Sequence, residues 1–147
     1  MSQMILILNG PNLNLLGIRQ PQVYGKTTLS DIENKCRARA KINKLEVDFR
    51  QSNMEGELVD WLHSARETHA GVIINAGAYT HTSIALMDAI SSIELPAVEV
   101  HLSNIHARED FRQQSYISKV AIGQICGFGG LGYELALDAL AARLQNS

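Results

Sequence analysis

Glu99 and His101 are the first pair of side chains in this sequence that could do acid–base chemistry. They are two residues apart in the stretch AVEVH, so on a β-strand they would project from the same face. A carboxylate beside an imidazole fixes the tautomer of the ring and favours its protonated form. His101 is therefore a candidate general acid, and the alternative is a purely structural His–Glu pair.

A candidate base lies in the polar loop that follows the apolar run at residues 5–8. A tyrosine ordinarily has a pKa of about 10, which is too high for a base at neutral pH. Arg19 precedes Tyr24 by five residues in this loop, and a guanidinium close to the phenol would stabilise the phenolate. The alternative is an exposed tyrosine in an ordinary loop.

Uncharged polar side chains follow the same predicted strands. Asn12 and Asn75 come at the ends of two of them and suit a hydroxylated, non-phosphorylated ligand or a bound water. Ser103 follows a third strand, where it and nearby backbone N–H groups could receive a carboxylate. All three residues also have a structural interpretation, because Asn and Ser commonly form turns and caps.

The elements that would position these groups alternate along the chain. Short apolar runs and alternating residues predict strands at residues 5–8, 45–50, 72–75, 97–101 and 119–126. Capping residues and apolar stripes predict helices from residue 27 or 28 to about 44, 55 to about 67, 82 or 83 to about 93, 108 to 112, and 133 to about 144.

This alternation with short connections is typical of an α/β protein with a parallel sheet and helices on both faces. We expect a flavodoxin-like, doubly wound, five-stranded parallel sheet with strand order 2-1-3-4-5. The wholly apolar first strand fits an interior position, and the alternating second strand fits an edge. We expect one catalytic domain over residues 1–147, with the loops after strands 1, 3 and 4 at one edge of the sheet.

The composition limits the classes of partner. Of 147 residues, 46% are hydrophobic and 19% are charged, and the formal net charge is −2. This balance argues against nucleic acid or a membrane surface as the partner. Because apolar runs stay well below ~18 residues, we expect a soluble, cytoplasmic protein. Cys36 and Cys126 are expected to be reduced structural thiols.

Several other uses of an α/β fold are disfavoured by particular residues. The run GFGGLG at residues 127–132 matches a dinucleotide-binding pattern, but no further strand or ribose-binding acid follows it, so a tight turn is preferred. A phosphoacceptor receiver domain needs acidic residues where Asn9 and Asn75 stand. Metal-binding spacings such as H-E-x-x-H and C-x-x-C are absent from the sequence, so we expect no metal site.

Three long blocks of the sequence resemble the type II 3-dehydroquinate dehydratases. They are N-G-P-N-L-N-L-L-G-x-R-x-P-x-x-Y-G at residues 9–25, N-A-G-A-Y-T-H-T-S at residues 75–83 and E-V-H-L-S-N-I-H-A-R at residues 99–108. The similarity covers essentially the whole chain, with the same order and spacing of blocks. It implies a cofactor-free dehydration of 3-dehydroquinate to 3-dehydroshikimate, in the shikimate pathway or in quinate breakdown.

The resemblance also implies roles for individual residues. Tyr24, with its pKa lowered by Arg19, would remove a proton from the carbon next to the ketone. The resulting enolate would be stabilised by a water held near Asn12. His101, oriented by Glu99, would protonate the departing hydroxyl. The residues implied to bind substrate are Asn75, His81, Asp88, Leu102 through its backbone, Ser103 and Arg112.

Asp88 leads to an expectation about assembly. On one helix, His81 and Asp88 would be two turns and ~10 Å apart, which is too far for one small substrate to touch both. The resemblance implies that Asp88 serves the site of a neighbouring subunit, in a trimer assembled into a dodecamer.

Two other functions stay open. One keeps the substrate but forms a Schiff base with a lysine, for which Lys26 is the nearest candidate. The other is a non-catalytic flavodoxin-like module that binds a polyol acid without turnover.

Overall fold

A computed structural model of the chain contains one sheet of five parallel strands in the order β2-β1-β3-β4-β5. The structure describes residues 2–18 and 21–146, and for Val23 and Tyr24 the backbone alone. The strands are β1 (Gln3–Asn9), β2 (Leu45–Gln51), β3 (Gly71–Asn75), β4 (Ala97–His101) and β5 (Gly123–Cys126). The predicted doubly wound sheet and its strand order are confirmed.

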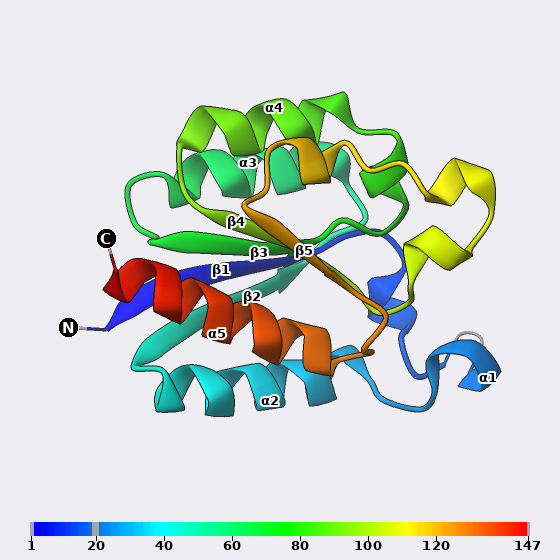
Figure 1. The fold of residues 1–147 in the computed structure, drawn as a ribbon, viewed down its shortest axis with the longest axis horizontal. Helices are drawn as coiled ribbons and strands as arrows, with labels where there is room; N and C mark the ends of the chain where they lie inside the picture. Colours follow the sequence, from blue (N-terminus) through cyan, green and yellow to red (C-terminus); the bar gives the residue numbers. More distant parts are fainter. Residues whose placement is uncertain (1, 19–20, 147) are drawn as a thin grey trace.

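Helices cover both faces of this sheet (Figure 1). The long helices are α2 (Leu29–Ile42), α3 (Glu55–Ala65), α4 (Ile84–Ile93) and α5 (Leu131–Gln145). Short helices lie between them: α1 (Pro21–Tyr24) and single 3-10 turns at Leu13–Leu15, Gly77–His81, Ile105–Ala107, Asp110–Arg112 and Ile117–Lys119. Helices α2 and α5 pack on one face, and α3 and α4 pack on the other (Figure 1).

The apolar run of β1 is unbroken because both of its faces are buried. Ile5 and Ile7 belong to the hydrophobic cluster under α2 and α5. Leu6 and Leu8 belong to the cluster under α3 and α4. All four side chains are at most 1% exposed. Burial of this strand on both faces fixes its place in the interior of the sheet, so its carboxyl end lies between those of its neighbours.

Helix α2 begins as its sequence predicts. The Oγ1 atom of Thr28 accepts a hydrogen bond from the backbone of Asp31, and the Asp31 carboxylate accepts one from the backbone of Thr28. This capping box satisfies two backbone donors at the start of the helix. The apolar stripe that predicts this helix ends at Ile42, and that member is wrong, because Ile42 is 75% exposed at the end of the helix.

Several expected elements differ in the structure. Strand β5 begins at Gly123 rather than 119, because Val120 and Ala121 both donate to the Ile117 carbonyl and close a turn. The helix predicted at 108–112 is only a 3-10 turn at Asp110–Arg112, and α5 begins at Leu131 rather than residue 133. The four-residue helix α1 was not predicted.

The sequence predicts Asn53 as the cap of α3, and this prediction is wrong. Met54 occupies the cap position, and its backbone N–H donates to Ser52 Oγ. The side chain of Asn53 instead accepts a hydrogen bond from the backbone of Asn12, 41 residues earlier. Asn53 therefore ties the loop after β1 to the loop after β2, a long-range contact that outweighs its local capping preference.

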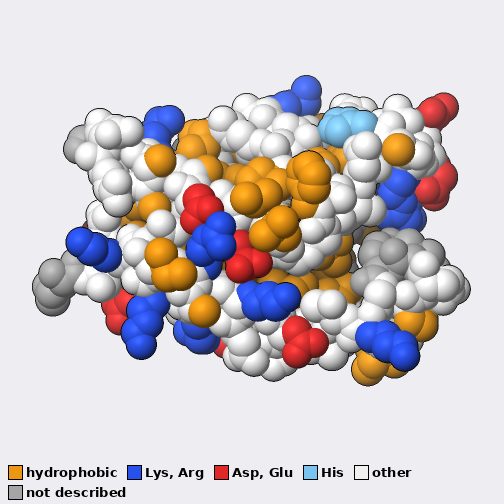
Figure 2. All heavy atoms as spheres, turned by 60° about the horizontal axis from the view of Figure 1, so that its bottom comes forward, with side chains coloured by type: hydrophobic (Ala, Val, Ile, Leu, Met, Phe, Trp, Pro, Cys, Tyr) orange, Lys and Arg blue, Asp and Glu red, His pale blue; other side chains and the backbone are white. Residues whose placement is uncertain are grey.

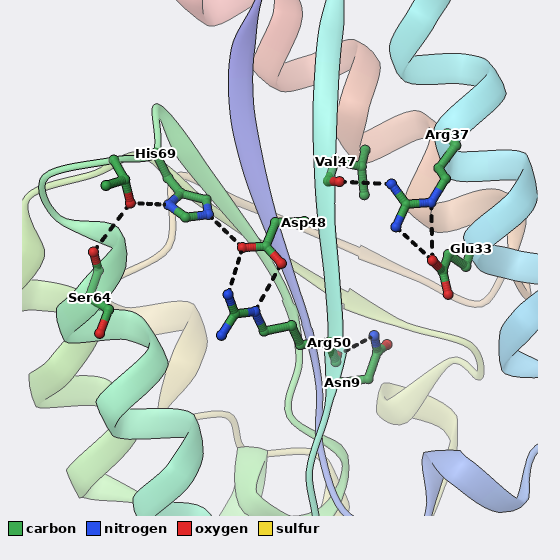
Figure 3. Close-up of polar contacts among 9 residues, drawn as sticks. Asn9, Glu33, Arg37, Val47, Asp48, Arg50, Ser64 and His69 are labelled. Carbon is green, nitrogen blue, oxygen red and sulfur yellow. Dashed lines mark hydrogen bonds and ion pairs between the residues drawn. The ribbon is translucent and has the colours of Figure 1, made fainter.

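The edge strand β2 is stabilised by a polar cluster (Figure 3). The Asp48 carboxylate accepts hydrogen bonds from Arg50 at 2.9 and 3.2 Å and pairs with His69 Nε2 at 2.8 Å. Burial raises the pKa of Asp48, but the bonds from Arg50 and His69 outweigh burial and lower it below its ordinary value. Sequence reasoning found no partner for His69, because its carboxylate comes from a strand 21 residues away.

The face formed by α2 and α5 carries intermixed basic and acidic side chains (Figure 2). Arg39 of α2 pairs with Asp138 of α5 at 2.8 Å, and Arg37 pairs with Glu33 within α2 at 2.7 Å. Both thiols are free, and burial raises the pKa of Cys36 to about 12 and that of Cys126 to about 11. Within the described residues, no helix has the length and apolar character needed to cross a membrane.

Candidate active site

A cavity of about 170 Å³ opens at the carboxyl ends of β1, β3 and β4. Its lining comes from three loops, within residues 11–16, 75–81 and 101–112. The predicted convergence of the loops after these three strands is therefore seen in the structure. A volume below the usual ~300–1,000 Å³ of small-molecule pockets favours a small ligand.

His101 and Glu99 form a buried pair beside this cavity. His101 ends β4 and is 5% exposed, and its Nε2 lies 2.5 Å from Oε2 of Glu99, which is fully buried. A carboxylate can only accept, so His101 Nε2 carries the hydrogen of this bond and Nδ1 is the ring nitrogen left for a ligand. The side chain of His101 lines the cavity, whereas Glu99 lies behind it.

The Glu99 carboxylate is held in its ionised form. Burial raises its pKa, but hydrogen bonds from His101 and from Ser115 Oγ, at 2.7 Å, outweigh burial and lower the pKa below its ordinary value. Ser115 is itself fixed, because its Oγ accepts from the backbone of Ser118. The arrangement places a buried negative charge within hydrogen-bonding distance of the His101 ring.

Gln124 approaches Glu99 from the neighbouring strand. It is the register partner of Glu99 on β5, and its side chain also contributes to the lowered pKa of Glu99. Among the described atoms, Gln124 Nε2 and Glu99 Oε1 are both buried without a hydrogen-bond partner, so the two groups are close but outside hydrogen-bonding geometry. Gln124 Oε1 pairs with Nε2 of His106 at 3.0 Å, a contact that the sequence did not indicate.

Asn75 and Asn12 reach the cavity from β3 and from the loop after β1. Asn75 is 3% exposed, and its Nδ2 donates to the hydroxyl of Tyr133 at 3.0 Å. Asn12 adopts a left-handed backbone conformation with φ 71°, which Asn tolerates better than most residues. Both predicted polar binders therefore line the same cavity as His101.

Further charged and polar groups line the cavity. His81 Nδ1 donates to the Gln114 carbonyl at 2.7 Å, so in the neutral ring Nε2 is a hydrogen-bond acceptor. Arg112 donates to Glu109 at 3.1 Å, and Ser103 and Leu102 contribute the turn after β4. Arg108 also lines the cavity, although sequence reasoning gave it no role.

Two predicted site residues are not placed by the structure. Arg19 lies outside the described residues, and for Tyr24 the structure describes the backbone of α1 alone. Asp88 is exposed on α4 and is not among the described residues that line this cavity. The premise that His81 and Asp88 share a helix is wrong, because His81 ends a separate 3-10 turn before α4 begins at Ile84.

The glycine-rich run after β5 is a structural turn, as the sequence analysis preferred. Gly127, with φ 95°, donates from its backbone to His101, and Gly129 donates to Leu102. A Cβ on Gly132 would lie 3.2 Å from Val100, so close packing of α5 on β4 requires a glycine there. The run thus supports the backbone of the turn that carries His101.

No group of three or more His, Cys, Asp or Glu side chains that could hold a metal ion occurs in residues 2–18 and 21–146.

Two polar residues of the site were missed from the sequence. Ser115 contacts Glu99 across 16 residues, and Tyr133 contacts Asn75 across 58. No local motif marks either contact. For Tyr133 a weak signal did exist, because a tyrosine on the buried face of a helix needs a partner for its hydroxyl.

Known proteins share both the sequence and the fold of this chain. Residues 3–141 match the family described as dehydroquinase class II. A 3-dehydroquinate dehydratase of Ruegeria pomeroyi is 66% identical over 141 residues, which are 96% of this chain and 95% of that protein. The corresponding protein of Dinoroseobacter shibae is 64% identical over 140 residues, covering 95% and 93%.

The structural comparison agrees. The crystal structure of a type II dehydroquinase from Propionibacterium acnes matches with a TM-score of 0.92 and 44% identity, over 97% of this chain and 98% of that one. The chain therefore belongs to the class II dehydroquinase family.

Proposed function

We propose that this protein is a lyase that dehydrates 3-dehydroquinate to 3-dehydroshikimate, in the shikimate pathway or in quinate catabolism. The observation that carries the proposal is the buried His101–Glu99 pair at the edge of a small polar cavity. It is supported by relatives named 3-dehydroquinate dehydratase that are more than 60% identical over nearly the full chain. The proposal treats residues 1–147 as one catalytic domain, and the single five-stranded sheet supports it.

The proposed reaction begins with removal of a proton from the carbon next to the ketone. Tyr24 is the base, and Arg19 lowers its pKa by stabilising the phenolate. The enolate that results is stabilised by a water held near Asn12. His101 then protonates the departing hydroxyl, while Glu99 stabilises its imidazolium form. The reaction releases water and leaves a carbon–carbon double bond conjugated to the ketone.

Substrate binding is assigned to the groups around the cavity. The carboxylate is received by Asn75, Ser103 and the backbone at Leu102. His81 Nε2, an acceptor in the neutral ring, suits a substrate hydroxyl, and Arg112 suits another. These groups are neutral or cationic, which matches an anionic, hydroxylated ligand.

Asp88 is assigned to the site of a neighbouring subunit. Its exposure on α4 leaves it accessible to another chain. We propose that the protein forms trimers that assemble into a dodecamer, in which Asp88 of one chain completes the site of the next. A monomer that is fully active in sedimentation experiments would contradict this assignment.

The decisive experiment measures conversion of 3-dehydroquinate to the conjugated enone by its ultraviolet absorbance. Purified protein should catalyse it, and Tyr24→Phe should lose nearly all turnover, a change of at least ~100-fold, while it still binds substrate. Tyr116→Phe is the matched control, because Tyr116 lies outside the cavity lining and should keep normal rates. Near-normal turnover by Tyr24→Phe would show that the base is another residue.

Two outcomes would favour the alternatives. Borohydride added with substrate would tag the protein covalently if Lys26 formed a Schiff base, and that result would rule out the tyrosine mechanism. Tight binding without turnover by the unaltered protein would identify a binding module instead of an enzyme.

A further inference from the structure

We infer that Tyr133, which lies outside the cavity, is a positioning residue that makes Asn75 present an N–H donor to the ligand. This inference rests on the proposed function, in which Asn75 receives the substrate carboxylate. Tyr133 is fully buried at the start of α5, and its hydroxyl lies between two asparagine side chains. It accepts from Asn75 Nδ2 at 3.0 Å and donates to Asn9 Oδ1 at 2.6 Å.

The direction of this hydrogen-bond chain is fixed at both ends by backbone groups. Asn9 Nδ2 donates to the carbonyl of Arg50 at 3.0 Å, so its Oδ1 must face Tyr133 (Figure 3). The backbone N–H of Gly77 donates to Asn75 Oδ1 at 3.2 Å, so its Nδ2 must face Tyr133. A carbonyl can only accept and a backbone N–H can only donate, so one orientation of each amide satisfies all four bonds.

The hydroxyl of Tyr133 is what links the two ends. With its hydrogen directed to Asn9, its oxygen is free only to accept, and it therefore selects the nitrogen of Asn75. Burial raises the pKa of Tyr133, so the hydroxyl stays protonated at neutral pH and keeps its hydrogen for Asn9.

The consequence for the ligand follows from the chemistry of an amide. Asn75 Nδ2 has two hydrogens, and Tyr133 is the acceptor of one among the described residues. Asn75 lines the cavity, and the proposal directs the other hydrogen into it. A carboxylate accepts this donor, whereas the inverted amide would oppose its oxygen to the carboxylate. Tyr133 thus contributes to selection of an anionic group without touching it.

The first test is Tyr133→Phe, which removes the hydroxyl and keeps the ring that packs in the core. The inverted amide then becomes accessible, and we expect KM for 3-dehydroquinate to rise on the order of tenfold, with little change in kcat or in the pH profile. Cys36→Ala is the matched control, because it removes a buried atom from the same hydrophobic cluster without touching Asn75, and it should leave KM unchanged.

A double-mutant cycle separates this role from a general loss of stability. If Tyr133 acts through Asn75, then Tyr133→Phe should raise KM in the unaltered background and have no further effect in Asn75→Ala. Equal effects in both backgrounds would overturn the inference. An unchanged KM in a folded Tyr133→Phe protein would also overturn the inference about Tyr133. The proposed function is judged separately, because it depends on turnover by the unaltered protein.

A second variant and a second measurement cover the case in which Tyr133→Phe fails to fold or substrate is not turned over. Asn9→Ala removes the acceptor of the tyrosine hydrogen, which can then point to Asn75 and favour the inverted amide. In protein labelled with ¹⁵N-asparagine, the side-chain NH₂ signals of Asn75 are identified in NMR spectra by their loss in Asn75→Ala. These signals should shift in Asn9→Ala. Unshifted signals would show that the chain does not set the orientation.

Discussion

The His101–Glu99 pair can be tested by removing its charge and keeping its shape. Glu99→Gln replaces a carboxylate by an amide of nearly the same size, in a position that is fully buried. Gln can still accept a hydrogen bond from His101 Nε2, so the ring keeps an orienting partner. What is lost is the negative charge that stabilises the imidazolium, and we therefore expect the effect in kcat rather than in KM.

The magnitude follows from the kind of bond that is weakened. A hydrogen bond to a charged group contributes about 1.5–3 kcal/mol, and each 1.4 kcal/mol is a factor of ten. Because Glu99 is inaccessible to water, solvent does not screen its charge. We expect kcat to fall roughly 10- to 150-fold, which lies at the lower end of the range ascribed to general acids.

The assay is the rate of enone formation at saturating substrate, with thermal melting as the check on folding. Ser115→Ala is the matched control, because it keeps the carboxylate and removes one neutral donor at 2.7 Å from Glu99. Its kcat should fall by a smaller factor, roughly twofold to tenfold. The expected order of rates is thus the unaltered protein, then Ser115→Ala, then Glu99→Gln.

A folded Glu99→Gln protein with kcat within twofold of normal would refute this reasoning. It would show that the charge behind His101 has no part in the rate-limiting step. A reversed order of the two variants would show instead that the position of Ser115, and not the charge of Glu99, controls the histidine.

Two further predictions concern the scaffold. Asp48→Asn should lower the free energy of unfolding by about 1–2 kcal/mol at pH 7. Because the folded pKa of Asp48 is lowered, the difference between the variant and the unaltered protein should shrink as pH falls below about 4. Urea unfolding at several pH values measures this difference. Gly10→Ala should lower the free energy of unfolding by about 1–3 kcal/mol and impair turnover, because a Cβ there would lie 2.3 Å from the Ala76 carbonyl. Gly56→Ala is the control, because its Cβ would meet open space, and it should be neutral or stabilising. Thermal melts of both variants measure the difference.

The parts of the fold that sequence predicted best are those decided by local burial. The apolar run of β1 indicated a strand covered on both faces, and its residues do pack alternately into two clusters. Thr28 and Ser83 were among the expected caps, and both accept from the backbone three residues on. Such signals depend on neighbours within one or two turns, so they can be read without knowing the fold.

The parts that sequence could not predict depend on contacts between distant segments. Asn53 was expected to cap α3, but its side chain binds the backbone of Asn12 on another loop. Residues 119–122 were assigned to β5 by their hydropathy, yet a turn closed on the Ile117 carbonyl prevents that strand from starting before Gly123. Competition between a local preference and a tertiary contact cannot be resolved from spacing alone.

In the candidate site, too, some residues were predicted from the sequence and others were missed. Residues at strand ends, such as Asn75 and His101, were predicted to meet because parallel strands end at one edge, and they do line one cavity. The partners Ser115 and Tyr133 were missed, because they meet Glu99 and Asn75 across 16 and 58 residues of sequence. Arg108 was missed for a different reason: a cation on a polar loop has no distinguishing pattern.

The residues that the cavity depends on are not all residues that a ligand can touch. Asn75 and His101 line the cavity, whereas Tyr133 and Glu99 lie behind them with no exposed surface. A buried polar group is tolerated only when its hydrogen bonds are satisfied, and an apolar replacement of similar shape is often neutral or stabilising for a fold. Stability alone therefore gives no reason for a carboxylate inside β4 or a hydroxyl inside α5. The proposed roles of the groups in front of them account for their presence, because the proposed general acid needs a fixed counter-charge and the proposed carboxylate-binding amide needs a fixed orientation.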